Sequence, residues 1–174
     1  QFNELTDEKL RFAAQIGASG IQMNTPKLPG EHRWEEADLR ALVEKTEAAG
    51  LKLEAIENVP VHFYHKAMLG LPGRDEQIEN YCATIRAVGA ADIPVLGYHF
   101  MPNSVWRTER SAPGRGGAGN TQFDMAVVDA AKSIDELRQF LPTSLGHQSA
   151  MPLAEPGTVL IDEETMWGNY TYFM

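Results

Sequence analysis

Two short motifs carry side chains that could do acid–base chemistry. Glu57 and His62 belong to the segment Glu57-Asn58-Val59-Pro60-Val61-His62, which follows a stretch of alternating apolar and polar residues. A carboxylate and an imidazole at the carboxyl end of a strand can bind a metal ion or transfer protons. The alternative is a loop carboxylate that caps backbone amides and a solvated histidine. Both interpretations stay open from these residues alone.

The second motif is Gly97-Tyr98-His99-Phe100-Met101-Pro102, which follows a short apolar run. Histidine can act as an acid or a base near neutral pH, so His99 and Tyr98 are the candidate catalytic residues. In the alternative interpretation, Tyr98 and Phe100 belong to the core and His99 is packed and hydrogen-bonded.

Arg107, Arg110 and Arg115 lie close together in the sequence beside several glycines. Arginine binds carboxylates and phosphates through paired hydrogen bonds, so the group predicts an anion site. The alternative is a solvated loop whose arginines pair with local acids such as Glu109. The glycine run over 113–119 is neither a Walker motif nor a dinucleotide fingerprint, because the residues that complete those motifs are absent.

The elements that must position these residues alternate along the chain. Apolar periodicity and capping residues predict helices over 6–17, 35–49 and 75–88, and strands over 20–24, 51–56 and 93–98. A loop is expected over 57–73, before the third helix. This alternation predicts an α/β fold of parallel strands with crossover helices. The polar loops that follow the strands then mark the working face.

The chain is predicted to be a single domain, 1–174, and the alternation of helices and strands stops after the third strand. A long loop is expected over 99–121, helices over 123–132 and 134–140, an irregular segment over 142–161 and a last helix over 162–174. Three strands are too few for a complete eight-stranded barrel, which needs about 250 residues. The chain starts without Met and ends on an apolar run, so we expect a partial (β/α)8 TIM barrel that is truncated at both ends.

Composition excludes several classes of protein. The 174 residues carry a net charge of −9, which disfavours binding to nucleic acid and to anionic membranes. Cys82 is the one cysteine, so the chain can form no internal disulfide. A reducing, cytoplasmic location is the expectation that follows.

Four motifs, in order, resemble mannonate dehydratases. They are Glu57-Asn58-Val59-Pro60-Val61-His62; Ile78-Glu79-Asn80-Tyr81; Gly97-Tyr98-His99-Phe100-Met101-Pro102 with Val105-Trp106-Arg107-Thr108; and Asp162-Glu163-Glu164-Thr165-Met166-Trp167-Gly168-Asn169-Tyr170. The resemblance implies the N-terminal half of a xylose-isomerase-like TIM barrel. It also implies a lyase that dehydrates D-mannonate to 2-keto-3-deoxy-D-gluconate in hexuronate (glucuronate) catabolism.

The same resemblance implies a divalent metal, Mn²⁺ or Fe²⁺, whose ligands come from later strands, beyond Met174. No metal ligand is therefore assigned within this chain. The substrate-binding candidates are Glu57, His62, Arg107 and Arg115, and the expected partner is a small sugar acid, with a homo-oligomer as a further option.

A chain without its metal ligands is expected to be inactive alone. Two alternatives remain from the sequence. One is a sugar isomerase or epimerase on the same barrel, because a fold alone does not decide an activity. The other is a non-catalytic module that binds sugar acids.

Overall fold

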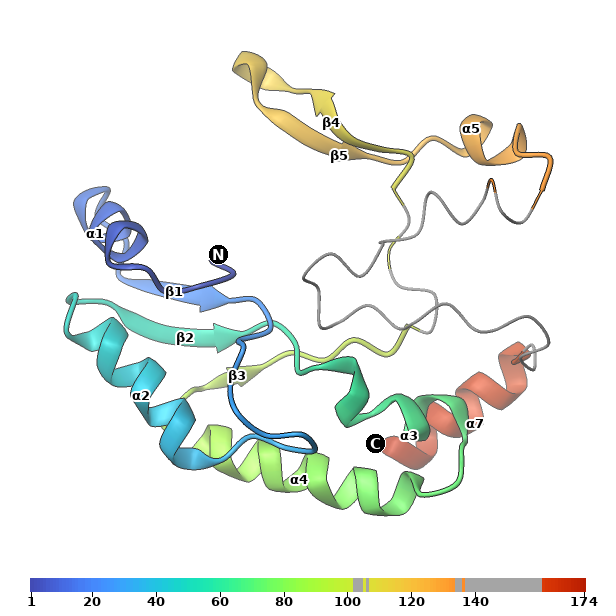
Figure 1. The fold of residues 1–174 in the computed structure, drawn as a ribbon, viewed down its shortest axis with the longest axis horizontal. Helices are drawn as coiled ribbons and strands as arrows, with labels where there is room; N and C mark the ends of the chain where they lie inside the picture. Colours follow the sequence, from blue (N-terminus) through green and yellow to red (C-terminus); the bar gives the residue numbers. More distant parts are fainter. Residues whose placement is uncertain (102–104, 106, 134–135, 137–160) are drawn as a thin grey trace.

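The centre of the fold is a sheet of three parallel strands in the order β1-β2-β3 (Figure 1). The strands are β1 (Gly20–Met23), β2 (Lys52–Ile56) and β3 (Val95–Leu96). The computed structural model describes residues 1–101, 105, 107–133, 136 and 161–174. Phe2 extends the sheet by one parallel bridge to Met23, so the residues at the start of the chain lie beside the end of β1. The predicted parallel α/β arrangement is confirmed.

Helices connect the strands, as the parallel arrangement requires. They are α1 (Asp7–Gln15), α2 (Glu36–Glu47), α3 (His65–Leu69) and α4 (Arg74–Ala90), with the short 3₁₀ helix η1 (Val61–Phe63) before α3. Thr6 begins α1, where its hydroxyl accepts a hydrogen bond of 3.2 Å from the backbone N–H of Lys9. In Figure 1, α2 and α4 lie on the same side of the sheet.

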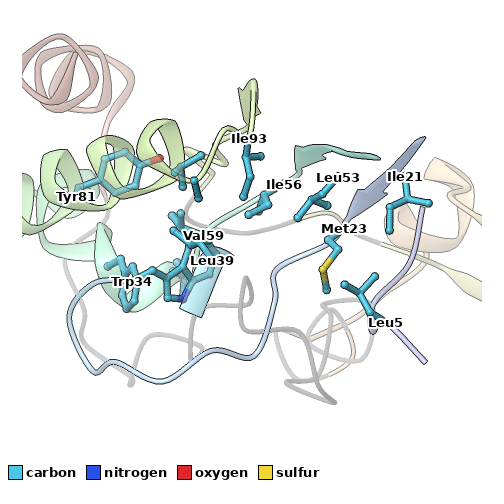
Figure 2. Close-up of a cluster of buried hydrophobic side chains, with 14 of the residues drawn as sticks. Leu5, Ile21, Met23, Trp34, Leu39, Leu53, Ile56, Val59, Tyr81 and Ile93 are labelled. Atoms are coloured by element: carbon cyan, nitrogen blue, oxygen red, sulfur yellow. The ribbon is translucent and has the colours of Figure 1, made fainter. Parts of the chain in front are cut away.

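The core lies between the sheet and these helices. Alternate strand residues are buried, among them Ile21 and Met23 in β1 and Leu53 in β2, as the two-residue period of a strand predicts (Figure 2). Trp34, at the entry to α2, is also buried. Its backbone N–H donates to the hydroxyl of Thr84 in α4 at 3.3 Å, which satisfies a polar group inside the core.

Three element boundaries differ from the sequence predictions. The loop predicted over 57–73 contains η1 and α3. The strand predicted over 93–98 pairs only at Val95 and Leu96. The third helix, predicted over 75–88, runs through Gly89 to Ala90, because Gly89 keeps a helical conformation there instead of a left-handed one.

The long loop predicted over 99–121 is instead partly a β-hairpin. Its strands are β4 (Glu109–Pro113) and β5 (Gly119–Gln122), which pair antiparallel, and the turn between them contains the 3₁₀ helix η2 (Arg115–Gly117). Gly116 and Gly117 have φ angles of 67° and 81°, a left-handed conformation that glycine adopts without strain. The hairpin was not predicted because its strands are polar and resemble a loop in sequence.

Further helices follow in the described part of the chain. They are α5 (Met125–Asp129), shorter than the helix predicted over 123–132, and α7 (Glu163–Phe173), which confirms the last predicted helix. The helix predicted over 134–140 and the irregular segment over 142–161 fall outside the described residues, except for Glu136 and Ile161. None of the helices in the described ranges is long and apolar enough to cross a membrane.

Candidate active site

The site begins with a close backbone contact between the ends of β2 and β3. The backbone N–H of Gly97 donates to the carbonyl of Ile56 at 2.8 Å, and that of Glu57 donates to the carbonyl of Met23 at 2.8 Å. A Cβ atom on Gly97 would overlap the carbonyl oxygen of Glu57. Glycine at position 97 therefore lets the segment after β3 pass directly against Glu57.

His99 follows this contact and has the environment of a proton acceptor. Its Nε2 atom is buried and has no hydrogen-bond partner among the described residues. Burial lowers the pKa of the imidazole, and the nearby carboxylate of Glu57 opposes this with a smaller upward effect on that pKa. Burial therefore favours the neutral form of the His99 imidazole near pH 7.

Polar residues from the first part of the chain lie at the same edge of the sheet as Glu57, where the strands end. The side-chain amide of Gln1 donates a hydrogen bond to the Glu57 carboxylate. Asn24, directly after β1, accepts from the backbone N–H of Thr25 at 2.8 Å and donates to the side-chain oxygen of Asn3 at 3.3 Å. Gln1, Asn3 and Asn24 were not among the sequence candidates. Asn24 could have been found, because it follows β1 as Glu57 follows β2.

His62 lies in a different environment from Glu57 and His99. It is an exposed residue of η1, and its ring packs edge-on against Phe63 with centroids 4.8 Å apart. Partial burial lowers its pKa, and the neighbouring imidazoles of His65 and His32 lower it further. His62 therefore lies in a helical turn, where the sequence predicted a simple loop.

Tyr98 contacts α7. Its hydroxyl lies 2.6 Å from that of Tyr170, and the two rings stack at 22° with centroids 6.3 Å apart. The hydrogen bond to Tyr170 raises the pKa of Tyr98. The two catalytic candidates, Tyr98 and His99, therefore face different surroundings although they are adjacent in sequence.

The arginine candidates lie on the hairpin. Arg107 precedes β4, and Arg115 is exposed in the turn at the other end of that strand. A five-residue strand is about 17 Å long, so the hairpin holds the two guanidinium groups apart. Figure 1 shows β4 and β5 well away from β1–β3. The structure thus brings together Glu57 and His99 but not the two arginines.

The described residues do not form a metal centre. Within the described ranges, no three His, Cys, Asp or Glu side chains come close enough together to hold a metal ion. A catalytic zinc or manganese site needs at least that many protein ligands. These residues can supply acid–base groups and hydrogen bonds, and no metal step is derived from them.

A pocket of about 450 Å³ lies between α4, β3 and the end of α7, and Tyr98 is one of its lining residues. Its lining is mainly apolar and includes Ile78, Cys82, Ile85 and Phe173. A binding site for a polar sugar acid needs several convergent hydrogen-bonding groups, and the aromatic residues with a hydroxyl in this lining are Tyr81 and Tyr98. Cys82 is half-buried in its wall.

Comparison with known proteins gives a consistent result. The family model for D-mannonate dehydratase (UxuA) matches residues 3–174. A mannonate dehydratase of Streptococcus pneumoniae (strain 70585) is 36% identical over 165 residues, which is 91% of this chain and 43% of that protein. One from Streptococcus suis (strain 05ZYH33) gives the same identity and the same coverage.

The fold agrees with the sequence comparison. The crystal structure of mannonate dehydratase from Streptococcus suis serotype 2 superposes with a TM-score of 0.70 and 29% sequence identity. The aligned region covers 99% of this chain and 46% of that one. The chain therefore spans less than half the length of the relatives that it matches.

Proposed function

The chain belongs to the D-mannonate dehydratase family, and we propose that the protein it comes from dehydrates D-mannonate to 2-keto-3-deoxy-D-gluconate. The observation that carries the proposal is the match of the family model to residues 3–174, almost the whole chain. The similarity in fold to a mannonate dehydratase supports it. The reaction makes the protein a hydro-lyase.

We propose that β1–β3 are consecutive strands of a (β/α)8 barrel. Their sequential order and parallel direction, with helices α2 and α4 on one side, support this assignment. In such a barrel the active site lies at the carboxyl ends of the strands. Asn24, Glu57 and His99 all follow strand ends, which is where the proposed chemistry requires them.

The reaction itself defines the role of His99. Dehydration removes a proton from C2, next to the carboxylate, and the hydroxyl from C3. A base takes the C2 proton, the C3 hydroxyl leaves as water with a proton from a general acid, and the enol that remains becomes the 2-keto product. A neutral imidazole can take the C2 proton, so we assign His99 as the base. Glu57 lies beside it, and its carboxylate can stabilise the imidazolium that forms.

The remaining substrate contacts are proposals of the same kind. Glu57 can accept hydrogen bonds from substrate hydroxyls, and His62 can donate or accept them. Arg107 and Arg115 are proposed partners of the substrate carboxylate, because guanidinium groups bind carboxylates in pairs of hydrogen bonds.

A divalent metal, Mn²⁺ or Fe²⁺, is proposed for the whole enzyme, and its chemistry would be to stabilise negative charge next to the carboxylate. Its ligands must include residues other than those described here. We also propose an assembly of identical subunits and a cytoplasmic location. The single cysteine, Cys82, supports the location, because cytosolic proteins rarely rely on disulfides.

The test is product analysis with the protein as its gene encodes it. Incubation with D-mannonate and Mn²⁺ should give a product lighter by one water. Interconversion at constant mass would indicate an isomerase or epimerase instead. Binding of D-mannonate without metal and without turnover would indicate a sugar-acid binding module.

A further inference from the structure

The residues on either side of His99 are held by α7. The Tyr98 hydroxyl is hydrogen-bonded to that of Tyr170 at 2.6 Å, and the rings stack. Phe100 packs edge-on against Tyr170 with centroids 5.3 Å apart, and lies 5.4 Å from Phe173. Tyr170 therefore contacts the residue before His99 and the residue after it.

His99, between Tyr98 and Phe100, has a different neighbour from these two residues. The ionisable neighbour that acts on it is Glu57, which follows β2, whereas Tyr98 and Phe100 contact α7. Tyr98 and Phe100 thus share a neighbour that His99, between them, does not, which is the alternation that an extended backbone produces. Fixing Tyr98 and Phe100 on one side therefore fixes the direction of His99 on the other.

The helix can serve as a fixed support because it is anchored independently. Asn169 is buried, with 7% of its surface exposed, and its side-chain amide donates to the carbonyl of Met68 in α3 at 3.1 Å. A Cβ atom on Gly70 would lie 2.9 Å from the Asn169 side-chain oxygen, so glycine allows this close approach.

A separate, solvent-exposed contact joins α7 to α4, in addition to the buried anchor at Asn169. The Tyr172 hydroxyl donates to the carboxylate of Asp75 at 2.8 Å, and the guanidinium of Arg74 lies 3.8 Å above the Tyr172 ring. Neither contact involves residues 98–100. The helix thus connects α3 and α4 to the segment that carries His99.

We propose that α7 positions His99 against Glu57 by holding Tyr98 and Phe100, and that Tyr170 is the positioning residue. The effect of this positioning on catalysis rests on the proposed function. The placement of the His99 imidazole by α7 does not depend on that function. Tyr170 acts through Tyr98 and Phe100 and does not itself touch the substrate.

The test uses Tyr170→Phe in the protein as encoded, which removes the hydroxyl pair and keeps the ring. Tyr172→Phe is the matched control, because it removes a hydroxyl from the same helix that bonds to Asp75. The first readout is the NMR signal of the His99 ring, assigned with His99→Gln. We expect Tyr170→Phe to shift this signal and to move its titration towards the ordinary value of 6.5, and Tyr172→Phe to leave it in place.

The second readout separates positioning from general loss of structure. Tyr170→Phe should lower kcat for D-mannonate about fivefold with KM within about twofold, because misplacing a catalytic group costs turnover more than binding. Tyr98→Phe should give the same loss, and the double variant should give no more, since both changes remove one hydrogen bond.

The possible failures are distinguishable. If Tyr170→Phe and Tyr172→Phe affect the His99 signal equally, the positioning proposal is overturned whatever the activity. If the unaltered protein does not dehydrate D-mannonate but Tyr170→Phe still shifts the His99 signal, the proposed function fails and the placement role of α7 stands.

Discussion

At the scale of single residues, the proposed chemistry depends on the protonation state of His99. Burial lowers the pKa of its imidazole below the ordinary value of 6.5, so the neutral form predominates near pH 7. A base must be neutral to accept a proton. The activity should therefore be present at neutral pH and should fall as the pH is lowered through the pKa of His99 in the folded protein.

This gives a prediction for the pH profile. In the encoded enzyme, kcat/KM for D-mannonate should fall on the acid side with a midpoint below 6.5. His99→Gln should lower kcat by about 10²- to 10⁴-fold and should remove that acid limb. His32→Gln, a change at an exposed histidine, is the control and should keep the unaltered profile. An acid limb that persists in His99→Gln would contradict the assignment of the base.

The sequence located Glu57 and His99 because both follow predicted strands, and the ends of parallel strands meet at one edge of a sheet. The same rule covers Asn24. Gln1 carried no such signal, since its place depends on a bridge made by Phe2. Tyr98 was paired with His99 by sequence distance, whereas the chain directs the two side chains to different neighbours.

At the scale of elements, the contact between β2 and β3 depends on a glycine. Gly97→Ala should lower the free energy of unfolding by about 1–3 kcal/mol, because the new methyl group would overlap the Glu57 carbonyl. Gly89→Ala is the matched control: Gly89 lies within α4, with nothing within 4 Å of its Cβ position. It should raise stability by about 0.5–1 kcal/mol. Urea unfolding measures both, and equal effects would contradict the close contact.

The docking of α7 gives another prediction at this scale. Asn169→Ala should leave the carbonyl of Met68 without its partner and lower stability by about 1–3 kcal/mol. Hydrogen exchange in residues 163–173 should become faster. Thr171→Val is the control, since the Thr171 hydroxyl bonds only to the carbonyl of Trp167 among the described contacts. Unchanged exchange in Asn169→Ala would show that another contact anchors the helix.

Elements with strong periodicity were predictable, and those set by tertiary contacts were not. The helix from Glu36 to Glu47 has apolar residues at helical spacing and a glycine after its end. The five-residue α3 lacks such a pattern and is stabilised from outside, where the side-chain oxygen of Gln77 accepts from the backbone N–H groups of Lys66 and Ala67. The hairpin over 109–122 has polar strands, so its sequence resembles a loop.

At the scale of the whole molecule, three histidines connect stability to pH. Burial is the largest cause of the lowered pKa values of His62, His65 and His99. The unfolded chain therefore binds more protons than the folded chain once the pH falls below the ordinary value of 6.5. The stability present above that pH is lost as the pH falls through the folded pKa values.

The corresponding measurement is urea unfolding at a series of pH values from neutral to mildly acidic. The midpoint should decrease steadily below pH 6.5. A variant with His62, His65 and His99 replaced by Gln should lose this slope and keep only the acid unfolding that carboxylates cause at lower pH. An identical slope in the variant would show that the histidines are not responsible.

The order of elements in the whole molecule was accessible from sequence because alternating helices and strands leave few topologies. The motifs around Glu57 and His99 then pointed to one family among the many that share such folds. Sequence could not give the position of the hairpin relative to the sheet. Figure 1 shows β4 and β5, with Arg115 in the turn between them, well away from β1–β3.

The most direct test of the account is the assay of D-mannonate dehydration with two samples, the 174-residue chain and the protein as encoded, each with and without Mn²⁺. We expect metal-dependent formation of 2-keto-3-deoxy-D-gluconate by the encoded protein. We expect none by the 174-residue chain alone, because the described residues of that chain form no metal centre. Dehydration by the 174-residue chain alone, or a product of unchanged mass from the encoded protein, would contradict the proposed function.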